Sequence, residues 1–168
     1  MIGYLGLGSN VGDRRANLQA AIDAMNAEGI TVIASSSTYD TDPVGEIVDQ
    51  PDFLNACVRI ETELDVDALL ATVKGIEHDL GRVSEGAVRH APRPIDIDIL
   101  LLGDIEHHSE RLSIPHADLL VRRFVLIPML ELDFDIVTPA GDRLSDALAV
   151  LPLDEGVTRE GPPLLAGG

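Results

Sequence analysis

The sequence has little of what would place it in a membrane or outside the cell. Its 168 residues include one cysteine, Cys57, which lies in the apolar run FLNACVRI. A lone cysteine in such a run is expected to be a small buried residue, not a nucleophile, in a protein of the reducing cytoplasm. No apolar run reaches about 18 residues, which excludes an ordinary membrane-spanning helix. The N-terminal MIGYLGLGSN also lacks the basic and apolar regions of a secretory signal.

Basic residues are scarce as well. The formal net charge is −17, and Lys74 is the only lysine. Such a charge argues against nucleic acid and anionic membranes as partners, because both would be repelled. The remaining cations are nevertheless clustered, since six of the eleven arginines lie between residues 82 and 123. Either these arginines form a local anion site or they only balance neighbouring acidic residues.

The hydrophobic periodicity predicts an α+β domain. The expected order of elements is β-α-β-β-α-β, which is typical of a ferredoxin-like βαββαβ sandwich with a largely antiparallel sheet, helices on one face and the other face open. Asp13 and Asp65 are expected to cap the two helices, and Gly29 and Gly81 to end them. Strands are expected at residues 1–8, 31–41, 52–64 and 92–101, and helices within 9–30 and 65–82.

The rest of the chain has weaker patterns. A tight turn is expected near Gly103 and Asp104, followed by a short partner strand and by irregular chain over residues 114–132. Together with these C-terminal additions, residues 1–155 are expected to form a single domain. Residues 156–168 are rich in proline and glycine and lack periodicity, so we expect a loosely ordered tail.

The stretch PRPIDIDILL carries the strongest signal. Side chains alternate in an extended chain, so Asp96 and Asp98 are expected on one face and the isoleucines between and beside them on the other. The two Cα atoms would lie about 6.6 Å apart, close enough for the carboxylates to repel each other or to share cations. Two such oxygen ligands suit Mg²⁺, which takes its other ligands from water and substrate phosphates. The alternative is that both only form salt bridges with the arginines.

The glycine-rich GLGSNVGD resembles a phosphate-binding loop but fits neither common fingerprint. Val11 stands where a dinucleotide-binding loop requires glycine, and Ser9 and Asn10 stand where a P-loop requires Lys and Ser or Thr. We interpret the segment as a tight strand-to-helix turn in which Gly8 and Gly12 permit an unusual backbone.

The segment RLSIPHADLLVRRF adds further cations. Arg111, His116 and Arg122 suit contact with phosphate, although a lone histidine is more often a structural residue. Glu77, on the preceding predicted helix, could orient an arginine or a metal-bound water, or could simply be solvated.

An aromatic plate is predicted beside the loop TDPVGE. Phe53 and Asn55 fall on one face of a predicted strand, where a ring and an amide with both donor and acceptor suit a flat heterocycle. Phe124 could form the opposite plate. Core packing is the alternative for Phe53, and for that residue alone it is the better one.

Together these motifs resemble the 6-hydroxymethyl-7,8-dihydropterin pyrophosphokinase family of folate biosynthesis. The likeness covers about residues 1–135 and is carried, in order, by GLGSNVGD, YDTDPVG, QPDFLNA, GR, PRPIDIDILL and IPHADLLVRRFVLIPMLEL. It implies the ferredoxin-like fold and an enzyme that transfers pyrophosphate from ATP to the pterin hydroxymethyl group, releasing AMP. Two Mg²⁺ ions as cofactor would neutralise charge at the phosphates while the hydroxyl attacks in line.

The resemblance also implies roles for individual residues. The pterin would lie between the two aromatic plates, and arginines and a histidine would grip the nucleotide. The expected catalytic residues are Arg82, Arg93, Asp96 and Asp98, of which Asp96 and Asp98 would bind the metal. The expected pterin-binding residues are Thr41, Asp42, Pro43, Val44, Phe53, Asn55 and Phe124. The expected nucleotide-binding residues are Lys74, Glu77, Arg89, Arg111, Leu112, Ser113, His116 and Arg122.

Two other functions stay open. A ferredoxin-like domain can be a noncatalytic ligand-binding module, and a Mg²⁺-dependent phosphoesterase would also use paired aspartates. The module would not need those aspartates beside arginines, and the phosphoesterase would not need a heterocycle site. The expected partners are therefore the small molecules ATP and 6-hydroxymethyl-7,8-dihydropterin, bound by a cytoplasmic monomer with neither nucleic acid nor membrane as partner.

Overall fold

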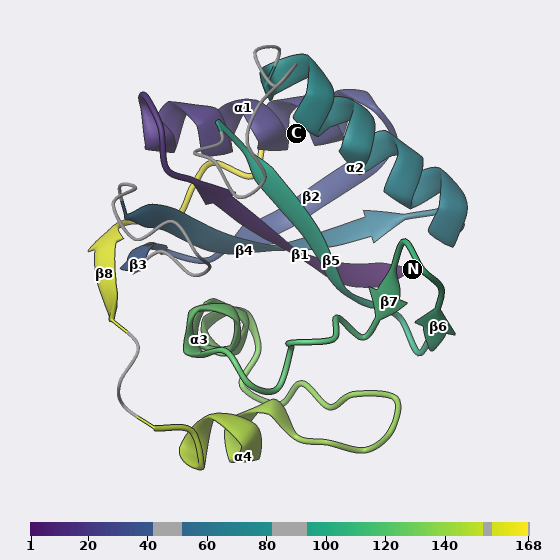
Figure 1. Ribbon diagram of the computed structural model, residues 1–168. Helices are drawn as coiled ribbons and strands as arrows, with labels where there is room; N and C mark the ends of the chain where they lie inside the picture. The colour runs from purple at the N-terminus through teal and green to yellow at the C-terminus, as the bar shows by residue number, and fades with distance from the viewer. Residues whose placement is uncertain (42–51, 82–93, 153–155, 168) are drawn as a thin grey trace.

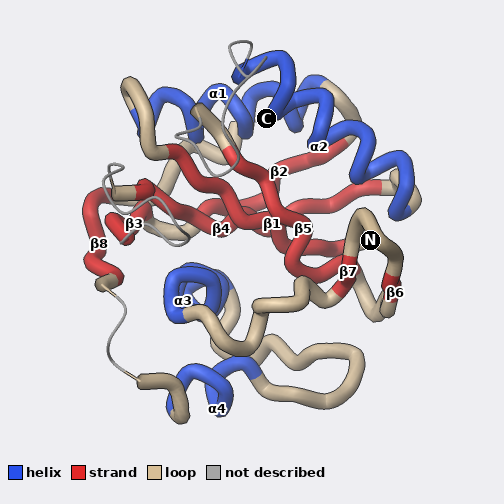
Figure 2. The backbone as a smooth tube through the Cα atoms, viewed as in Figure 1, coloured by secondary structure: helices blue, strands red, loops and turns tan. Residues whose placement is uncertain are grey.

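The computed structural model describes residues 1–41, 52–81, 94–152 and 156–167, which form a mixed α+β fold with helices on both faces of a sheet (Figures 1 and 2). In chain order the elements of these residues are β1 Ile2–Ser9, α1 Arg14–Ala27, β2 Ile30–Ser35, β3 Thr38–Thr41, β4 Phe53–Thr62, α2 Val66–Gly81, β5 Asp96–Leu102, β6 His107–His108, β7 Ser113–Ile114, α3 Arg123–Leu132, α4 Leu144–Ala149 and β8 Val157–Gly161.

The main sheet places the aspartate-bearing strand at one edge. Its order is β5-β1-β4-β3-β8, with β2 also paired to β4, while β6 and β7 form a separate small sheet. Each of these pairings is antiparallel, which confirms the expected largely antiparallel sheet. β1 lies between β4 and β5, so it connects the strands that carry the candidate site.

The helices α1 and α2 cover one face of the sheet, as expected (Figure 1). Asp13 Oδ1 accepts a hydrogen bond from the Ala16 N–H at 3.1 Å, and Asp65 Oδ1 accepts one from the Ala68 N–H at 2.8 Å, so both are N-caps. Gly29, with φ of +87°, follows the end of α1. Buried side chains recur at helical spacing, namely Leu18, Ala21, Ile22 and Met25 in α1 and Leu69, Leu70, Val73 and Ile76 in α2.

The expectation that the opposite face is open is wrong. The helix α3 lies against it and packs with Tyr4, Cys57 and Leu100 of the sheet in a second buried cluster, while α4 packs on α3 farther from the sheet (Figure 1). The sheet is therefore covered on both faces, and the candidate site described below lies on the α3 face.

The expectation of irregular chain over residues 114–132 is wrong for its second half, because that half forms α3. Pro128 lies inside the helix, where a proline removes one backbone donor and so weakens the helical signal in the sequence. Burial of Leu126 and Met129, neither of which is exposed to solvent, offsets this cost.

Residues 31–41, expected to form one strand, form two. Both β2 and β3 pair with β4, but Ser36 and Ser37 interrupt the strand between them. Ser36 Oγ accepts a hydrogen bond from the Cys57 N–H at 2.9 Å and donates one to the Ser37 carbonyl at 2.7 Å. Local serine hydrogen bonds of this kind compete with the strand ladder, which explains the interruption.

The expectation of a loosely ordered tail is wrong for its described residues, 156–167. β8 lies within them and pairs with β3. Two amide side chains of α1 then hold the chain that follows: Gln19 Nε2 donates to the Leu165 carbonyl at 2.8 Å, and Asn26 Nδ2 donates to the Ala166 carbonyl at 2.7 Å. Composition of the tail could not reveal these partners, because they lie far away in the sequence.

Glu131 fastens α3 to the sheet. Its carboxylate accepts hydrogen bonds from the Ser37 N–H at 2.9 Å, the Ser37 hydroxyl at 2.8 Å and the Tyr39 hydroxyl at 2.6 Å. Burial, together with the hydrogen bond to Glu131, raises the pKa of Tyr39 to about 12. We expect Glu131→Ala to lower the free energy of unfolding by about 1–2 kcal/mol, because these donors lose a charged acceptor.

Urea unfolding monitored by circular dichroism measures that loss. Glu63→Ala, at an exposed position between β4 and α2, is the matched control and should change the free energy of unfolding by less than about 0.5 kcal/mol. Equal effects of the two substitutions would contradict the anchoring role of Glu131.

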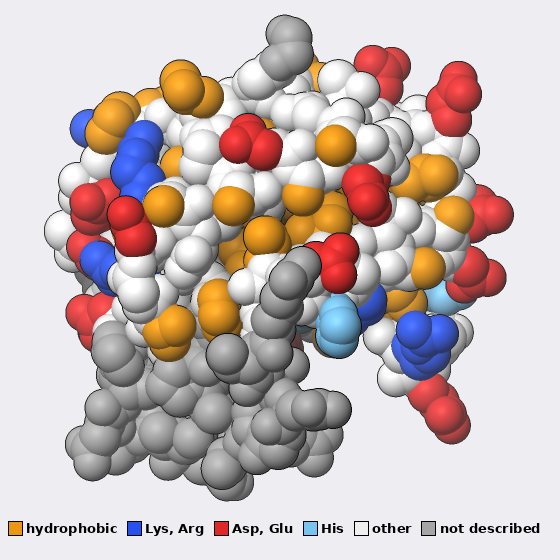
Figure 3. Space-filling view, turned by 90° about the horizontal axis from the view of Figure 1, so that it is seen from above, with side chains coloured by type: hydrophobic (Ala, Val, Ile, Leu, Met, Phe, Trp, Pro, Cys, Tyr) orange, Lys and Arg blue, Asp and Glu red, His pale blue; other side chains and the backbone are white. Residues whose placement is uncertain are grey.

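The surface agrees with the acidic composition. Acidic side chains are spread over the face seen from above in Figure 3, where basic ones are fewer. Among the helices of the described residues, none is both long and apolar enough to cross a membrane.

Candidate active site

The two aspartates of β5 lie beside glycines of β1. In the sheet register Asp98 pairs with Gly6 and Asp96 with Gly8, and Gly8 pairs on its other side with Asn55 of β4. Cross-strand partners point to the same face, so both carboxylates and the amide lie on the α3 face. This confirms that the two aspartates share a face. Neighbouring side chains pack over these glycines, Asn55 over Gly8 and Leu100 over Gly6.

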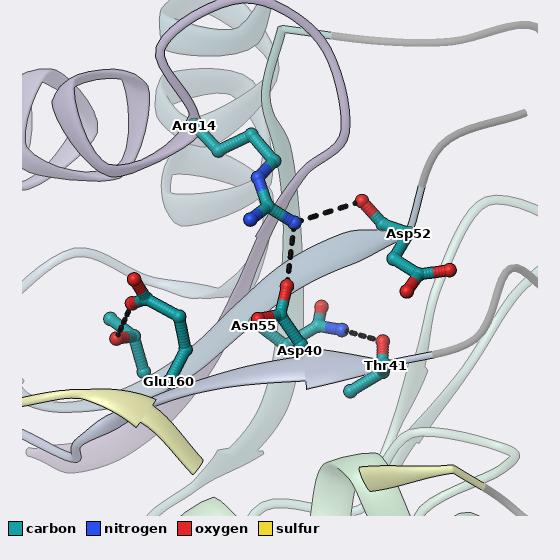
Figure 4. Close-up of polar contacts among 7 residues, drawn as sticks. Arg14, Asp40, Thr41, Asp52, Asn55 and Glu160 are labelled. Atoms are coloured by element: carbon teal, nitrogen blue, oxygen red, sulfur yellow. Dashed lines mark hydrogen bonds and ion pairs between the residues drawn. The ribbon is translucent and has the colours of Figure 1, made fainter. Parts of the chain in front are cut away.

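Gly8 is required for close packing, not for an unusual backbone. A Cβ atom there would lie 2.7 Å from Asn55 Oδ1 and 3.5 Å from a ring carbon of Phe53. Asn55 Nδ2 in turn donates a hydrogen bond to Thr41 Oγ1 (Figure 4). Positive φ, expected at both glycines of this turn, is found at Gly12, where φ is +64°.

A pocket of about 680 Å³, here called the aromatic pocket, opens on this face. It lies among β1, β3, β4, β5 and α3, and its volume includes space that is open to solvent. Phe53 and Phe124 are half-buried and line it, so core packing is not the role of Phe53. The expected site residues that line the aromatic pocket are Thr41, Phe53, Asn55, Asp96, Asp98, Arg122 and Phe124.

A second pocket of about 700 Å³, here called the cation pocket, lies among α2, β5 and the segment 109–117. Five of the residues expected to bind a nucleotide line it: Lys74, Arg111, Leu112, Ser113 and His116. Asp98 lines both pockets. A reaction between a ligand in one pocket and a ligand in the other would therefore take place beside Asp98.

The surroundings of Asp98 disfavour its charge. The protein packed around it raises the pKa of Asp98 by desolvation, although the side chain stays accessible to solvent, and the charge of Asp96 raises that pKa further. His116, Lys74 and Arg122 lower it without offsetting these two effects. A cation brought to the aspartate pair would therefore be stabilised there, which weighs against the view that local arginines already neutralise it.

The donor set fits a magnesium ion. Asp96 and Asp98 offer adjacent carboxylates, and within the described ranges no group of three or more His, Cys, Asp or Glu side chains could hold a metal by itself. Magnesium commonly binds through one or two carboxylates and takes its remaining ligands from water and substrate phosphates.

Glu77 belongs to neither pocket lining. Its Oε2 accepts a hydrogen bond from the Ile97 N–H at 2.8 Å, and its Oε1 lies 3.0 Å from Lys74 Nζ. Burial raises the pKa of Glu77, while Ile97 and Lys74 act to lower it. Glu77 thus holds both β5 and Lys74, which line the cation pocket, although it does not line that pocket itself.

Asp118 orients His116, which lines the cation pocket, and Arg122, which lines the aromatic pocket. His116 Nδ1 accepts a hydrogen bond from the Asp118 N–H at 3.1 Å, so the neutral ring carries its proton on Nε2 and can donate it to an anion. Arg122 Nη2 lies 3.1 Å from Asp118 Oδ2, and its guanidinium carbon lies 5.5 Å from the centre of the Phe124 ring. Arg122 is therefore fixed beside the aromatic plate.

Some of the expected site residues lie outside the described part of the chain. Conversely, some residues that line the aromatic pocket were not predicted from the sequence. Those outside are Asp42, Pro43, Val44, Arg82, Arg89 and Arg93. The missed residues form the floor of the aromatic pocket, including Gly6, Gly8, Cys57, Leu100 and Pro128. The sequence does hold one signal for them: Gly6 and Gly8 are two residues apart, as Asp96 and Asp98 are, so the two glycines share one face of their strand. Cys57 is buried, as expected, and burial raises the pKa of its thiol.

Paired aspartates between an aromatic pocket and a cation pocket suit the binding of a flat molecule beside a phosphate-bearing one. The family model for 7,8-dihydro-6-hydroxymethylpterin-pyrophosphokinase (HPPK) matches residues 4–134. The chain therefore belongs to the HPPK family.

Two bacterial relatives named 2-amino-4-hydroxy-6-hydroxymethyldihydropteridine pyrophosphokinase match the chain over most of their length. The protein of Methylorubrum extorquens is 46% identical over 149 residues, 88% of this chain and 92% of the relative. The protein of Pseudomonas aeruginosa is 39% identical over 157 residues, 93% of this chain and 94% of the relative.

Longer relatives contain a similar stretch. The mitochondrial folate synthesis bifunctional protein of Pisum sativum is 43% identical over 128 residues, which is 76% of this chain but 24% of that protein. The crystal structure of a Plasmodium falciparum HPPK-DHPS triple mutant has a TM-score of 0.69 at 16% identity, covering 88% of this chain and 42% of its own. At 16% sequence identity, this structural similarity shows a shared fold and nothing about function.

Proposed function

We propose that this chain transfers pyrophosphate from ATP to the hydroxymethyl group of 6-hydroxymethyl-7,8-dihydropterin, giving AMP and the pterin diphosphate in folate biosynthesis. The observation that carries the proposal is the position of Asp98, which lines both the aromatic pocket and the cation pocket. The two bacterial relatives, which carry the name of this activity, support it.

The aromatic pocket is the proposed pterin site. Phe53 and Phe124 would stack on the ring system, and Asn55 would read its polar edge. Because Asn55 Nδ2 donates to Thr41, its Oδ1 remains to accept an N–H of the heterocycle. Asp42, Pro43 and Val44, outside the described residues, are proposed from the family resemblance to complete this site.

The cation pocket is the proposed nucleotide site. Lys74, Arg111 and His116 would bind the phosphates, with Leu112 and Ser113 along the nucleotide and Glu77 holding Lys74. Arg82, Arg89 and Arg93 would add further positive charge.

Asp96 and Asp98 would hold two Mg²⁺ ions. Bound there, magnesium would neutralise phosphate charge and orient the β-phosphate toward the pterin hydroxyl. The protein's own part is to keep the hydroxyl beside Asp98, to present Arg122 to the transferring group and to leave no reactive thiol as a competing nucleophile. Cys57 fits that last role, because its pKa is raised and it is buried.

The ferredoxin-like topology is a further part of the proposal. The order β5-β1-β4-β2, with α1 and α2 on one face, supports it. We also propose that the single domain expected over residues 1–155 includes the described tail as well, since β8 pairs with β3 and Leu164 belongs to a buried cluster. A cytoplasmic monomer is likewise proposed, and the single buried cysteine suits the reducing cytoplasm.

Product identity tests the proposal. The protein is incubated with MgATP and 6-hydroxymethyl-7,8-dihydropterin, and the products are separated by chromatography and followed by phosphorus NMR. AMP and the pterin diphosphate in equal amounts are expected. Free phosphate without pterin modification would instead indicate a phosphoesterase, and binding without turnover would indicate a noncatalytic module.

Gly8→Ala is expected to weaken the pterin site. The new Cβ would meet Asn55 Oδ1 at 2.7 Å, so the amide that reads the pterin must move. We expect the KM for the pterin to rise about tenfold or more, equivalent to the loss of one well-placed hydrogen bond, with little change in the KM for ATP. Gly75→Ala, in α2 with nothing within 4 Å of the added Cβ, is the control. Equal KM values in both variants would contradict the role of Gly8.

A further inference from the structure

Arg14, at the start of α1, connects the two strands whose ends form one wall of the aromatic pocket (Figure 4). Its Nη1 donates to Asp40 Oδ1 of β3 at 2.7 Å and to the carbonyl oxygen of Asp52 at 3.1 Å. Asp40 comes directly before Thr41, and Asp52 directly before Phe53. One guanidinium nitrogen thus holds the last part of β3 and the residue that leads into β4.

These attachment points lie next to residues that line the pocket. Thr41 is the cross-strand partner of Phe53 in the β3–β4 register, and both line the aromatic pocket. The hydrogen bond from Asn55 to Thr41 spans the same two strands. Arg14 and that hydrogen bond therefore both hold the end of β3, at Thr41, close to the start of β4.

Arg14 is not itself a lining residue of either pocket. Its side chain is 29% exposed and that of Asp40 is 35% exposed, so water screens the pair only in part. A partly shielded, charge-assisted contact is strong enough to fix a geometry, while its removal leaves no charge sealed in the core. A local change at the pocket wall, without loss of the fold, is the expected consequence.

We propose that Arg14 is a positioning residue for the pterin, acting through Asp40 and Asp52 on the placement of Thr41, Asn55 and Phe53. This inference rests on the proposed function, and it assigns a part in pterin binding to a residue that lines neither pocket. Without Arg14 the ends of β3 and β4 separate more easily, and the amide of Asn55 loses its fixed orientation toward the heterocycle.

The adjacent arginine provides a matched control. Arg15 is also half-buried in the first turn of α1 and also reaches β3, but its Nη1 donates to Thr38 Oγ1 at 3.3 Å and its Nη2 to the Pro163 carbonyl at 3.1 Å. Thr38 bonds Glu160 of β8 at 2.8 Å. Arg15 therefore holds the tail and the opposite end of β3.

The experiment is steady-state kinetics of Arg14→Gln and Arg15→Gln beside the wild type, with AMP as the measured product. Arg14→Gln is expected to raise the KM for the pterin about tenfold, the equivalent of one positioned hydrogen bond, and to change kcat and the KM for ATP less than about threefold. Arg15→Gln is expected to leave all three constants within about twofold. Arg14→Lys, which keeps a donor and a charge, should recover part of the lost pterin affinity.

Asp40→Asn tests the same inference in a second way, because it weakens the contact between Arg14 and Asp40 while Arg14 itself is kept. It should raise the KM for the pterin by no more than Arg14→Gln does, and the double variant should be no worse than Arg14→Gln alone, because Arg14→Gln already removes the contact with Asp40. An unchanged KM for the pterin in Arg14→Gln, or an equal rise in Arg15→Gln, overturns the inference. Additive effects in the double variant also overturn it. A wild type that makes no AMP overturns the proposed function instead, so the two failures are distinguishable.

Discussion

Asp96→Asn and Asp98→Asn are each expected to reduce kcat by roughly 10³-fold or more, the scale of losing several kcal/mol of metal-based charge stabilisation. Asparagine keeps the shape of the side chain but removes the charge on which a magnesium ion depends. Both residues line the aromatic pocket, and Asp98 also lines the cation pocket, so the effect should fall on turnover more than on the affinity for the pterin alone.

The same substitution at Asp98 should not destabilise the protein. The pKa of Asp98 is raised in the folded state, so the stability that its proton contributes is present at low pH and is lost as pH rises through that value. At neutral pH the ionised carboxylate therefore opposes folding. Asp98→Asn removes this penalty, and its melting temperature is expected to equal or exceed that of the wild type.

Kinetics and thermal unfolding of the two variants, with Mg²⁺ in excess, measure both effects. Asp104→Asn is the matched control, because Asp104 is exposed in the turn that follows β5. The control should retain wild-type kcat. Full turnover in either site variant, or an activity loss accompanied by a comparable fall in melting temperature, would contradict the assignment of the aspartates to the metal.

The aspartate pair could be predicted from sequence because it depends on local geometry alone. Alternation along one strand places Asp96 and Asp98 together whatever surrounds them. The same holds for α1 and α2, whose caps, Asp13 and Asp65, lie directly beside regular apolar spacing. Features set by neighbours in sequence were therefore predictable.

The features that sequence reasoning missed depend on contacts between distant segments. Pro128 weakens the local signal for α3, which forms because its apolar side packs on the sheet. The tail gains its order from β3 and from side chains of α1, more than a hundred residues away in sequence. Gly8 was interpreted as a flexible turn residue because nothing nearby shows that Asn55 would lie against it. Tertiary packing decided each of these cases.

The aromatic plates carry the last prediction, for which the chain contains its own control. Phe53 and Phe124 line the aromatic pocket from β4 and α3, while Phe134, the third phenylalanine, is 65% exposed beyond α3. Stacking of a flat heterocycle on an aromatic side chain contributes about 1–3 kcal/mol, so Phe53→Ala and Phe124→Ala should each raise the KM for the pterin roughly 5- to 150-fold.

The two plates should differ in their effect on the nucleotide. Arg122 lies over the Phe124 ring, so Phe124→Ala also frees a cation that is proposed to face the transferring group, and it should lower kcat. Phe53→Ala should leave kcat and the KM for ATP close to wild type. Phe134→Ala should change none of these constants. Steady-state kinetics in both substrates separates the cases. A pterin KM that is unaffected by both pocket substitutions would show that the heterocycle does not lie between these rings, and the aromatic pocket would then need another ligand.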